Sequence, residues 1–321
     1  MGNSPSLYSA SFQTFINNFE FFKNEYDKYK VDCTVYQKKA NRQDFILLVN
    51  KVFDRTDHFE LSLQTADHFI SYNHINLCNI LEHSEKSEFQ CLNQNFIHSI
   101  AIEYPVNSLQ ELIIKNKSSL RKSQMAEQTY LNESHSWYVL KSLVSVSDYM
   151  YKSGLYVGDI SPKNVLIDQE GEVKLLNFYM VSDFKTSLDF SREHSGYRTT
   201  FPPEYLSKLK VLDWSTEDID KKKADVFSIG MTLLCATSNE YAESFYDWSN
   251  YSVKFDKVVK KINLLKSQNF SSDFTNLLVR MLDPEFKKRP TFVELSYLIE
   301  QRINPGRKRG ISTVLGMINR M

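Results

Sequence analysis

The stretch Val157-Gly158-Asp159-Ile160-Ser161-Pro162-Lys163-Asn164-Val165-Leu166-Ile167 decides how this chain is interpreted. Apolar residues at helical spacing precede it, and a short apolar run over residues 173–178 follows it. Asp159 and Asn164 are five residues apart on a predicted loop, so their side chains can face one small volume. A carboxylate and an amide in such a volume can hold a hydroxyl group and a cation together.

The composition indicates an ordinary globular protein, with 42% hydrophobic and 24% charged residues in a chain of 321. Lys+Arg and Asp+Glu both number 39, so the net charge gives no reason to expect a nucleic-acid partner. Only nine residues are glycine, and any glycine-rich phosphate loop therefore starts at a disadvantage. The cysteines lack metal-ligand spacing and are interpreted as reduced thiols, buried as small hydrophobic side chains: Cys33, Cys78, Cys91 and Cys235.

Location is predicted from two features of the sequence. No apolar run approaches the roughly 20 residues of a membrane span, and no secretory signal peptide is visible, so we expect a cytoplasmic protein. The first residues match the myristoylation pattern M-G-x-x-x-[ST], which makes Gly2 a candidate acylation site. The alternative is a chance match in a small-residue tail. A single myristoyl chain would give marginal, reversible membrane association.

The first third of the chain is predicted to be rich in strands. Aromatic residues at helical spacing predict a short helix within residues 12–29, and β-rich runs with a polar turn predict strands over 31–52. A helix is expected over 58–72 and a strand over 96–104. Residues 115–129 are polar and are predicted to form a loop.

The remainder is predicted to be mostly helical, over residues 134–151, 224–237, 255–265, 274–282 and 291–301. A strand-rich part followed by a helix-rich part predicts an α+β fold of two unequal lobes. We predict a tail and short helix over 1–24, a small lobe over 25–105, a larger lobe over 106–303 and a basic tail over 304–321.

The order of these elements and motifs resembles the protein kinase fold, over roughly residues 25–303. Asp225 begins a D-V-F-S-I-G run that is similar to the family's D-x-W-S-x-G, whose aspartate holds the catalytic-loop backbone. Glu204 follows Pro203 as in the A-P-E motif, and Arg289 in K-K-R-P-T resembles its ion-pair partner. Three motifs in this order and at this spacing are not expected by chance.

The resemblance also implies chemical roles. Asp159 matches the aspartate that accepts the proton of the substrate hydroxyl, and Asn164 matches the asparagine that holds the second metal ion. Lys163 lies where many tyrosine kinases carry an arginine, which implies a cation near the γ-phosphate. Lys51 resembles the phosphate-holding lysine of V-A-I-K, and Val35 resembles the valine that follows the glycine-rich loop.

Several residues depart from the family pattern where nucleotide and metal are bound. Counting back from Val35, the glycine positions are occupied by Lys28, Lys30 and Cys33, whose side chains would obstruct the approach of backbone amides to phosphate. Asn177 replaces the metal-binding aspartate of D-F-G. An amide oxygen is a weaker ligand for Mg²⁺ than a carboxylate, so Asn164 and Asn177 together imply weak metal binding.

Other departures concern regulation. Gly158 replaces the arginine of H-R-D, so a phosphorylated activation loop would lack that counter-charge. Tyr197 replaces the threonine that contacts the catalytic aspartate. Thr65 lies where the regulatory helix should carry the glutamate that pairs with the lysine; Asp67 or Glu60 could substitute only in a shifted helix register.

Three functional interpretations stay open. In the first, the chain is a pseudokinase that signals by binding protein partners, with impaired binding of ATP and Mg²⁺. In the second, it is an active, divergent Ser/Thr protein kinase that transfers the γ-phosphate of ATP to protein hydroxyls. In the third, only the second lobe resembles a kinase, and the first third is an unrelated binding module without a five-stranded sheet around Lys51. The first is preferred because several nucleotide contacts are altered at once.

Overall fold

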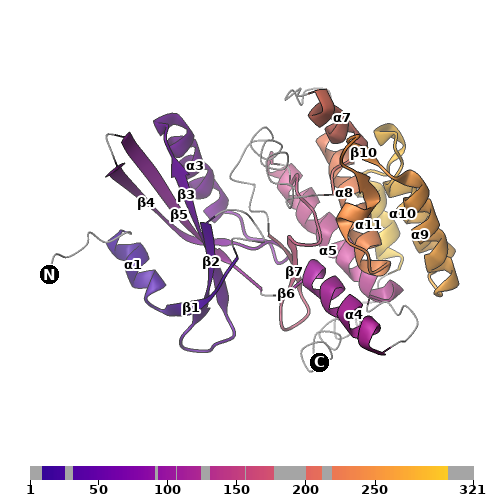
Figure 1. Ribbon diagram of the computed structural model, residues 1–321, viewed down its shortest axis with the longest axis horizontal. Coiled ribbons are helices and arrows are strands. Elements are labelled where there is room, and N and C mark those ends of the chain that lie inside the picture. The colour runs from indigo at the N-terminus through magenta and orange to yellow at the C-terminus, as the bar shows by residue number, and fades with distance from the viewer. Residues whose placement is uncertain are drawn as a thin grey trace. The chain divides into compact units, whose positions relative to one another are not determined.

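The chain forms two compact units, Met1–Val106 (unit 1) and Asn107–Met321 (unit 2). The computed structural model describes residues 9–25, 32–90, 93–105, 107–123, 131–155, 157–176, 200–211 and 219–302. Unit 1 is built on a β-sheet and unit 2 is mostly helical (Figure 1). This confirms the predicted α+β fold with a strand-rich first part and a helix-rich second part.

Unit 1 contains a five-stranded antiparallel sheet with the strand order β1-β2-β3-β5-β4. Its strands are β1 (Phe19–Asn24), β2 (Asp32–Lys38), β3 (Phe45–Phe53), β4 (Ile80–Gln90) and β5 (Asn93–Glu103). Lys51 lies on β3, opposite His98 of β5. The absence of such a sheet would have favoured the interpretation of the first third as an unrelated module; the sheet is present, so the structure does not support that interpretation.

Both faces of this sheet are covered by helices. On one face, α1 (Ala10–Ile16) packs its buried Phe12 into a cluster with Leu48 and Ala101. On the other face, Ser62 of α3 (Thr56–Ile70) contacts His98, which is three residues from Ala101 on β5. Because consecutive side chains of a strand point to opposite faces, α1 and α3 lie on opposite sides of the sheet.

The helix predicted within residues 12–29 is shorter than its aromatic spacing suggests. It ends at Ile16, and strand β1 begins at Phe19. The side-chain amide of Asn18 donates to the carbonyls of Thr14 and Phe15, which satisfies backbone groups at the helix end. The spacing of the aromatic residues beyond Phe19 also fits a helix, but this segment forms a strand because it pairs with β2.

Unit 2 combines helices with short strands. A three-stranded sheet has the order β6-β7-β8. The elements are β6 (Asn107–Ser108), α4 (Leu109–Ser123), α5 (Glu133–Lys152), β7 (Val165–Ile167), β8 (Val173–Leu175), α7 (Pro203–Val211), α8 (Lys221–Thr237), η2 (Ala242–Phe245), β9 (Tyr246–Asp247), β10 (Ser252–Val253), α9 (Phe255–Ser267), α10 (Ser272–Met281), η3 (Phe286–Lys288) and α11 (Phe292–Glu300).

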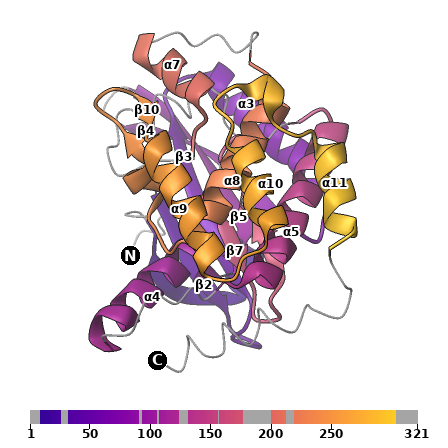
Figure 2. The same ribbon diagram turned by 90° about the vertical axis from the view of Figure 1, so that its right-hand side faces the viewer.

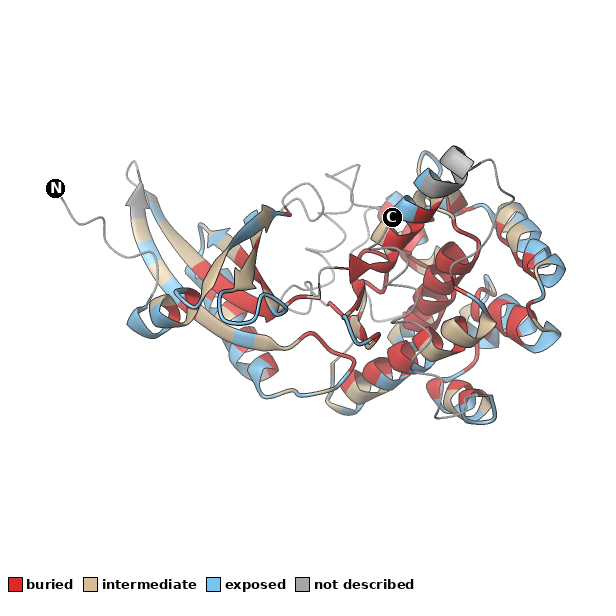
Figure 3. Cartoon of the chain, turned by 90° about the horizontal axis from the view of Figure 1, so that it is seen from below, coloured by how far each residue is buried: buried red, intermediate tan, exposed pale blue. Residues whose placement is uncertain are grey.

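Helix α8 is the centre of unit 2. Every residue from Ala224 to Thr237 is buried, and α8 contacts α4, α5, α9 and α10. Figure 3 shows the buried residues of this unit concentrated on its inner helices. Gly230 permits close packing, because a Cβ atom there would lie 3.0 Å from the Cβ of Met281. The helix that begins at Asp225 is therefore a rigid base for whatever its side chains hold.

The polar loop predicted over residues 115–129 is wrong in its first part. Helix α4 runs to Ser123, and Leu112, Ile113 and Asn116 are buried on its inner face. The apolar residues that direct this helix precede Lys115, and the sequence from Lys115 to Ser123, taken by itself, is mostly polar. Residues 124–129 lie outside the described part of the chain.

Candidate functional site

Residues 157–164 form a loop between α5 and β7, and Asp225 holds its start. The backbone amides of Val157 and Gly158 donate to the Asp225 carboxylate at 3.3 and 3.1 Å. The Tyr151 hydroxyl also donates to it, at 3.2 Å. Burial raises the pKa of Asp225 to about 7, and the three donors oppose this rise by favouring the ionised form. The structure thus brings together Asp225 and the loop that the motif pairs it with.

Gly158 has a backbone φ of 81°. This is the left-handed region, which glycine enters without the steric cost that a Cβ atom imposes. The glycine at the position of the H-R-D arginine is therefore explained by the backbone of this loop. An arginine introduced there would meet strain before it could act as a counter-charge.

Asp159, Lys163 and Asn164 come together at the centre of the loop. The Asn164 side-chain amide donates to Asp159 Oδ2 at 2.8 Å and to the Asp159 carbonyl at 3.1 Å. Lys163 Nζ lies 4.0 Å from Asp159 Oδ2, and all three side chains are buried. A carboxylate positioned in this way can accept a proton from a hydroxyl group, with a cation beside it.

Three residues that the sequence analysis missed support the other end of the loop. The hydroxyls of Thr200 and Thr232 both donate to the Ile160 carbonyl, and the Ser228 hydroxyl donates to the Thr200 carbonyl at 2.9 Å. Thr232 is seven residues after Asp225, two turns along α8 on the same face. That spacing was the signal in the sequence that could have identified Thr232.

The Asn164 side chain also offers an oxygen ligand. Asn164 is fully buried, and its Oδ1 accepts no hydrogen bond from any residue that the structure describes. A buried amide oxygen without a donor is costly unless a ligand or ion completes it. Hard cations such as Mg²⁺ take oxygen ligands, so Asn164 fits the metal role that the resemblance implies.

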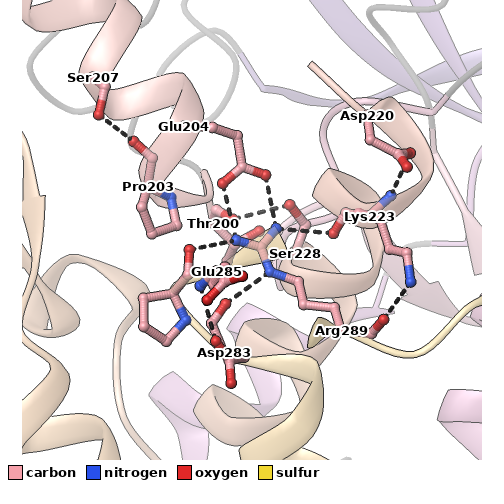
Figure 4. A network of polar contacts seen from close by, with 11 residues as sticks. Thr200, Pro203, Glu204, Ser207, Asp220, Lys223, Ser228, Asp283, Glu285 and Arg289 are labelled. Atoms are coloured by element: carbon pink, nitrogen blue, oxygen red, sulfur yellow. Dashed lines mark hydrogen bonds and ion pairs between the residues drawn. The ribbon is translucent and has the colours of Figure 1, made fainter. Parts of the chain in front are cut away.

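Glu204 and Arg289 form a buried ion pair between α7 and the segment before α11. The Arg289 guanidinium donates to both Glu204 carboxylate oxygens, at 2.7 and 2.9 Å, and only 1% of Arg289 is exposed. It also donates to the carbonyls of Lys223, Asp283 and Pro284, so its charge is surrounded by acceptors (Figure 4). This network joins α7, the start of α8 and the η3 region.

In unit 1, Lys51 and Val35 lie on the face of the sheet that α3 covers. Val35 is fully buried on β2, and Cys33 is buried two residues before it. Desolvation lowers the pKa of the Lys51 ammonium to about 8. The Cys33 thiol at a glycine position is therefore packed into the sheet, and it adds volume where the family has only a hydrogen atom.

A polar chain that the sequence analysis missed links α3 to β4 and β5. Ser62 Oγ hydrogen-bonds His98 Nδ1 at 2.8 Å, and His98 Nε2 hydrogen-bonds His83 Nδ1 at 3.2 Å. His83 Nε2 hydrogen-bonds Asp67 Oδ1 at 3.0 Å. Desolvation, with the charges of His83 and Lys51, lowers the pKa of His98 to about 3, so its imidazole is neutral near pH 7.

Thr65 of α3 stands where the protein kinase pattern has the glutamate that pairs with the lysine. Thr65 Oγ1 donates to the Leu61 carbonyl of its own helix at 2.6 Å. Asp67, one of the two possible substitutes, contacts His83 instead. The side chains of α3 thus hold this helix to the sheet through histidines rather than through a glutamate at position 65.

Several predicted residues lie outside the described residues. They are Gly2, Lys28, Lys30, Cys91, Asn177 and Tyr197. Their roles stay predictions from the sequence. Within the described part of the chain, no helix is both long enough and apolar enough to cross a membrane.

The chain is similar to known protein kinases. The family model for the protein kinase domain matches residues 36–298. A putative serine/threonine-protein kinase of Acanthamoeba polyphaga mimivirus is 24% identical over 87% of this chain and 94% of its own length. CBL-interacting protein kinase 26 of Oryza sativa subsp. japonica is 31% identical over 44% of this chain and 27% of its own length. Dual specificity mitogen-activated protein kinase kinase sek-1 of Caenorhabditis elegans is 25% identical over 43% of this chain and 39% of its own length.

Proposed function

Because the chain belongs to the protein kinase family, we propose that it is a kinase-like protein with weak or absent phosphoryl transfer that acts by binding other proteins. The observation that carries this proposal is Asn177, which stands where the family has its metal-binding aspartate. Phosphoryl transfer depends on positioning and on metal electrostatics. The loss of a charged metal ligand therefore lowers the rate even where the catalytic loop is well formed.

The glycine-loop positions support the same proposal. Cys33 occupies one of them as a fully buried side chain, and lysines occupy the other two. Backbone amides cannot approach a phosphate as closely where a side chain lies between them. We therefore propose that this chain binds ATP weakly, although protein kinase domains in general use ATP and Mg²⁺.

The catalytic loop supplies the residual chemistry in this proposal. Asp159 accepts the proton of an incoming hydroxyl, and the Asn164 amide orients its carboxylate. Lys163, 4.0 Å from Asp159, provides a cation for developing negative charge. Asn164 Oδ1 and the Asn177 side chain would hold Mg²⁺, which supplies charge neutralisation when bound.

The direct test is a phosphate-transfer assay with ATP and Mg²⁺ on the unmodified chain and on Asp159→Ala. We expect the two proteins to transfer phosphate at rates within about tenfold of each other, because the missing carboxylate already limits the reaction. Thermal shift with ATP, measured with and without Mg²⁺, reports nucleotide binding separately. Robust Mg²⁺-dependent transfer that Asp159→Ala abolishes would overturn the proposal.

A second candidate function is an active, divergent Ser/Thr kinase. The observation that favours it is the assembled loop, in which Asp159, Lys163 and Asn164 are brought together. In that case Asn177→Asp should raise the transfer rate by about a hundredfold or more, because removal of one electrostatic contact commonly costs that much. Asn177→Asp combined with Asp159→Ala is the matched control. No gain with Asn177→Asp, in a protein that binds ATP, would exclude this candidate.

The proposed partners are proteins, and acylation of Gly2 would add a membrane surface to them. Acylation of Gly2 stays a prediction from the sequence pattern. Intact-mass measurement after co-expression with a myristoyltransferase tests it. Gly2→Ala is the control, and an unchanged mass in both proteins would remove the membrane from the proposal.

A further inference from the structure

Three lysines of unit 2 converge on one carboxylate, far along the chain from the catalytic loop. Lys261 Nζ lies 2.6 Å from Glu240 Oε1, and Lys117 Nζ lies 3.3 Å from Glu240 Oε2. Lys257 Nζ lies 3.9 Å from the same Oε2. We call these four side chains the lysine cluster. Three ammonium groups around one carboxylate leave a local excess of two positive charges.

The helices that supply the lysine cluster are themselves basic. Helix α9 carries Lys257, Lys260, Lys261 and Lys266 against the single acid Asp256. Helix α4 carries Lys115 and Lys117 against the single acid Glu111. Figure 2 shows α4 and α9 on the same side of unit 2, and a lysine of each helix forms an ion pair with Glu240.

The acid on α4 caps the start of the helix. Glu111 Oε2 accepts hydrogen bonds from the Ser108 amide at 2.7 Å and from the Ser108 hydroxyl at 3.1 Å, at the start of the helix. The whole chain has equal numbers of basic and acidic residues. The positive charge of the lysine cluster is therefore a local concentration, because the chain as a whole carries no excess of basic residues.

Aromatic contacts help to hold two of the three lysines in place before any ligand arrives. Lys117 Nζ lies 4.7 Å from the centre of the Tyr241 ring, and Lys257 Nζ lies 5.0 Å from the centre of the Phe245 ring. The three lysine side chains are 15–31% exposed. Their ammonium groups are therefore partly desolvated and ordered, which reduces the entropy lost when an anion binds.

The charges of the lysine cluster influence one another. Desolvation lowers the pKa of Lys257, and Lys261, Lys117 and Lys254 add to the lowering while Glu240 opposes it. The pKa of Glu240 is lowered because its bonds to the lysines outweigh desolvation. A second anion would relieve the repulsion that Glu240 alone leaves among the ammonium groups.

We propose that the lysine cluster is a docking site for an acidic segment of a partner protein, which presents carboxylate or phosphate groups to Lys117, Lys257 and Lys261. The site is small, with lysines rather than arginines, and is flanked by the exposed ring of Tyr241. A nucleic acid or a membrane needs a broad basic surface, whereas an extended acidic peptide needs a few ordered ammonium groups beside an aromatic ring. This inference rests on the proposed function in one respect only: both take the binding partner to be a protein.

The experiment measures binding of short labelled peptides to the full chain by fluorescence anisotropy, without nucleotide. One peptide is rich in glutamate, a second carries phosphoserines, and a third has glutamine in place of the acidic residues. Inorganic phosphate as a competitor separates a phosphate-selective site from one that takes either anion. We expect the acidic peptides to bind at least about tenfold more tightly than the glutamine peptide at an ionic strength near 0.1 M, where screening acts over about 10 Å.

The variant Lys117→Gln/Lys257→Gln/Lys261→Gln should lose about tenfold or more of that affinity, since each exposed charge contact contributes up to about fivefold. Lys266→Gln on the same helix is the matched control and should bind as the unmodified chain does. Glu240→Gln keeps every lysine and removes the internal competitor. It should bind the acidic peptides more tightly than the unmodified chain.

The Glu240→Gln variant keeps the proposal testable if the triple variant fails to fold. Unchanged or weaker peptide binding by a folded Glu240→Gln protein would show that the lysines serve only as counter-charges of Glu240. Equal binding by the triple variant and the control, no binding at low salt, or stronger binding of RNA or of phosphatidylserine vesicles would each overturn the proposal. None of these readouts depends on phosphoryl transfer, so the proposed function can fail separately.

Discussion

Units 1 and 2 treat their buried polar groups in different ways. In unit 2, Asp225 receives three donors and Arg289 is surrounded by a carboxylate and three carbonyls. In unit 1, His98 is fully buried and is kept neutral between Ser62 and His83. A buried charge persists where groups of opposite polarity compensate its lost hydration, as around Arg289, whereas desolvation and the neighbouring charges of His83 and Lys51 keep His98 neutral. Unit 2 should therefore be sensitive to the loss of one partner, and unit 1 should lose stability as the pH falls.

The largest effect expected from this comparison is at Arg289. Arg289→Met should lower the free energy of unfolding of unit 2 by about 3–5 kcal/mol, because it leaves Glu204 without its buried partner. Chemical denaturation followed by tryptophan fluorescence measures this, since the tryptophans with described positions lie in unit 2.

The matched control for Arg289 is Arg302→Met. Arg302 pairs with Asp273 at the surface, where both side chains are about half exposed, so its loss should cost less than about 1 kcal/mol. Equal destabilisation by the two variants would contradict the assignment of the Glu204 pair as the stabilising one.

The effect expected next is a pH dependence in unit 1. The folded pKa of His98 is about 3, below the value of about 6.5 in an unfolded chain, so the unfolded state binds more protons between these values. Stability from His98 is thus fully present above pH 6.5 and is lost as the pH falls toward 3. From pH 7 to pH 5 the loss should be about 2 kcal/mol. Hydrogen exchange of the β3 and β5 amides measures it.

Two histidine variants sharpen this second prediction. His98→Gln should flatten the pH dependence of protection in β5, whatever its effect on stability at pH 7. His58→Gln changes an exposed histidine on α3 and should leave the pH dependence unchanged. A slope that persists in His98→Gln would show that another group in unit 1 titrates.

An effect of similar size is expected at Asp225. Asp225→Asn keeps the size of the side chain but leaves one oxygen where the carboxylate offers two, so an amide of Val157 or Gly158 loses its acceptor. The cost should be about 1–3 kcal/mol. Denaturation gives the total, and faster hydrogen exchange at the two loop amides should locate it. Protection that is unchanged at both amides would contradict the role of Asp225.

The smallest effect is expected at Gly158. Gly158→Arg restores the arginine of the family motif, yet it should lower stability by about 1–2 kcal/mol, because φ is 81° there. Gly158→Ala should cost a similar amount, which would separate backbone strain from charge. A stabilised Gly158→Arg protein would show that the loop backbone can change its conformation.

Much of the fold could be predicted from the sequence, because its signals are local. Helices α5, α8, α9, α10 and α11 were predicted from apolar spacing to within a few residues of their observed bounds. The predictions were wrong where the spacing of apolar residues fits both a helix and a strand, or where tertiary packing extends a helix into a polar segment. The aromatic residues near Phe19 fitted both a helix and a strand, and only pairing with β2 distinguished them.

In the candidate site, the sequence predicted the residues that belong to family motifs. Asp159, Asn164 and Asp225 were identified from their spacing, and the structure brings them to one loop. Thr200 and Thr232 were missed, because a hydroxyl that supports one carbonyl belongs to no family motif; for Thr232 only its spacing from Asp225 was a signal. Ser62, His83 and His98 were missed for a related reason, since three separate elements supply them.

The sequence by itself determined the protein kinase family, the α+β fold and the loop that holds Asp159, since motif spacing and apolar periodicity are properties of the chain alone. Only the tertiary structure decided how buried charges are compensated. It placed Arg289 against Glu204 across 85 residues, it made His98 neutral beside Ser62, and it gathered the lysine cluster around Glu240. Hydration and electrostatic energies depend on distance in space, which separation along the chain does not reveal.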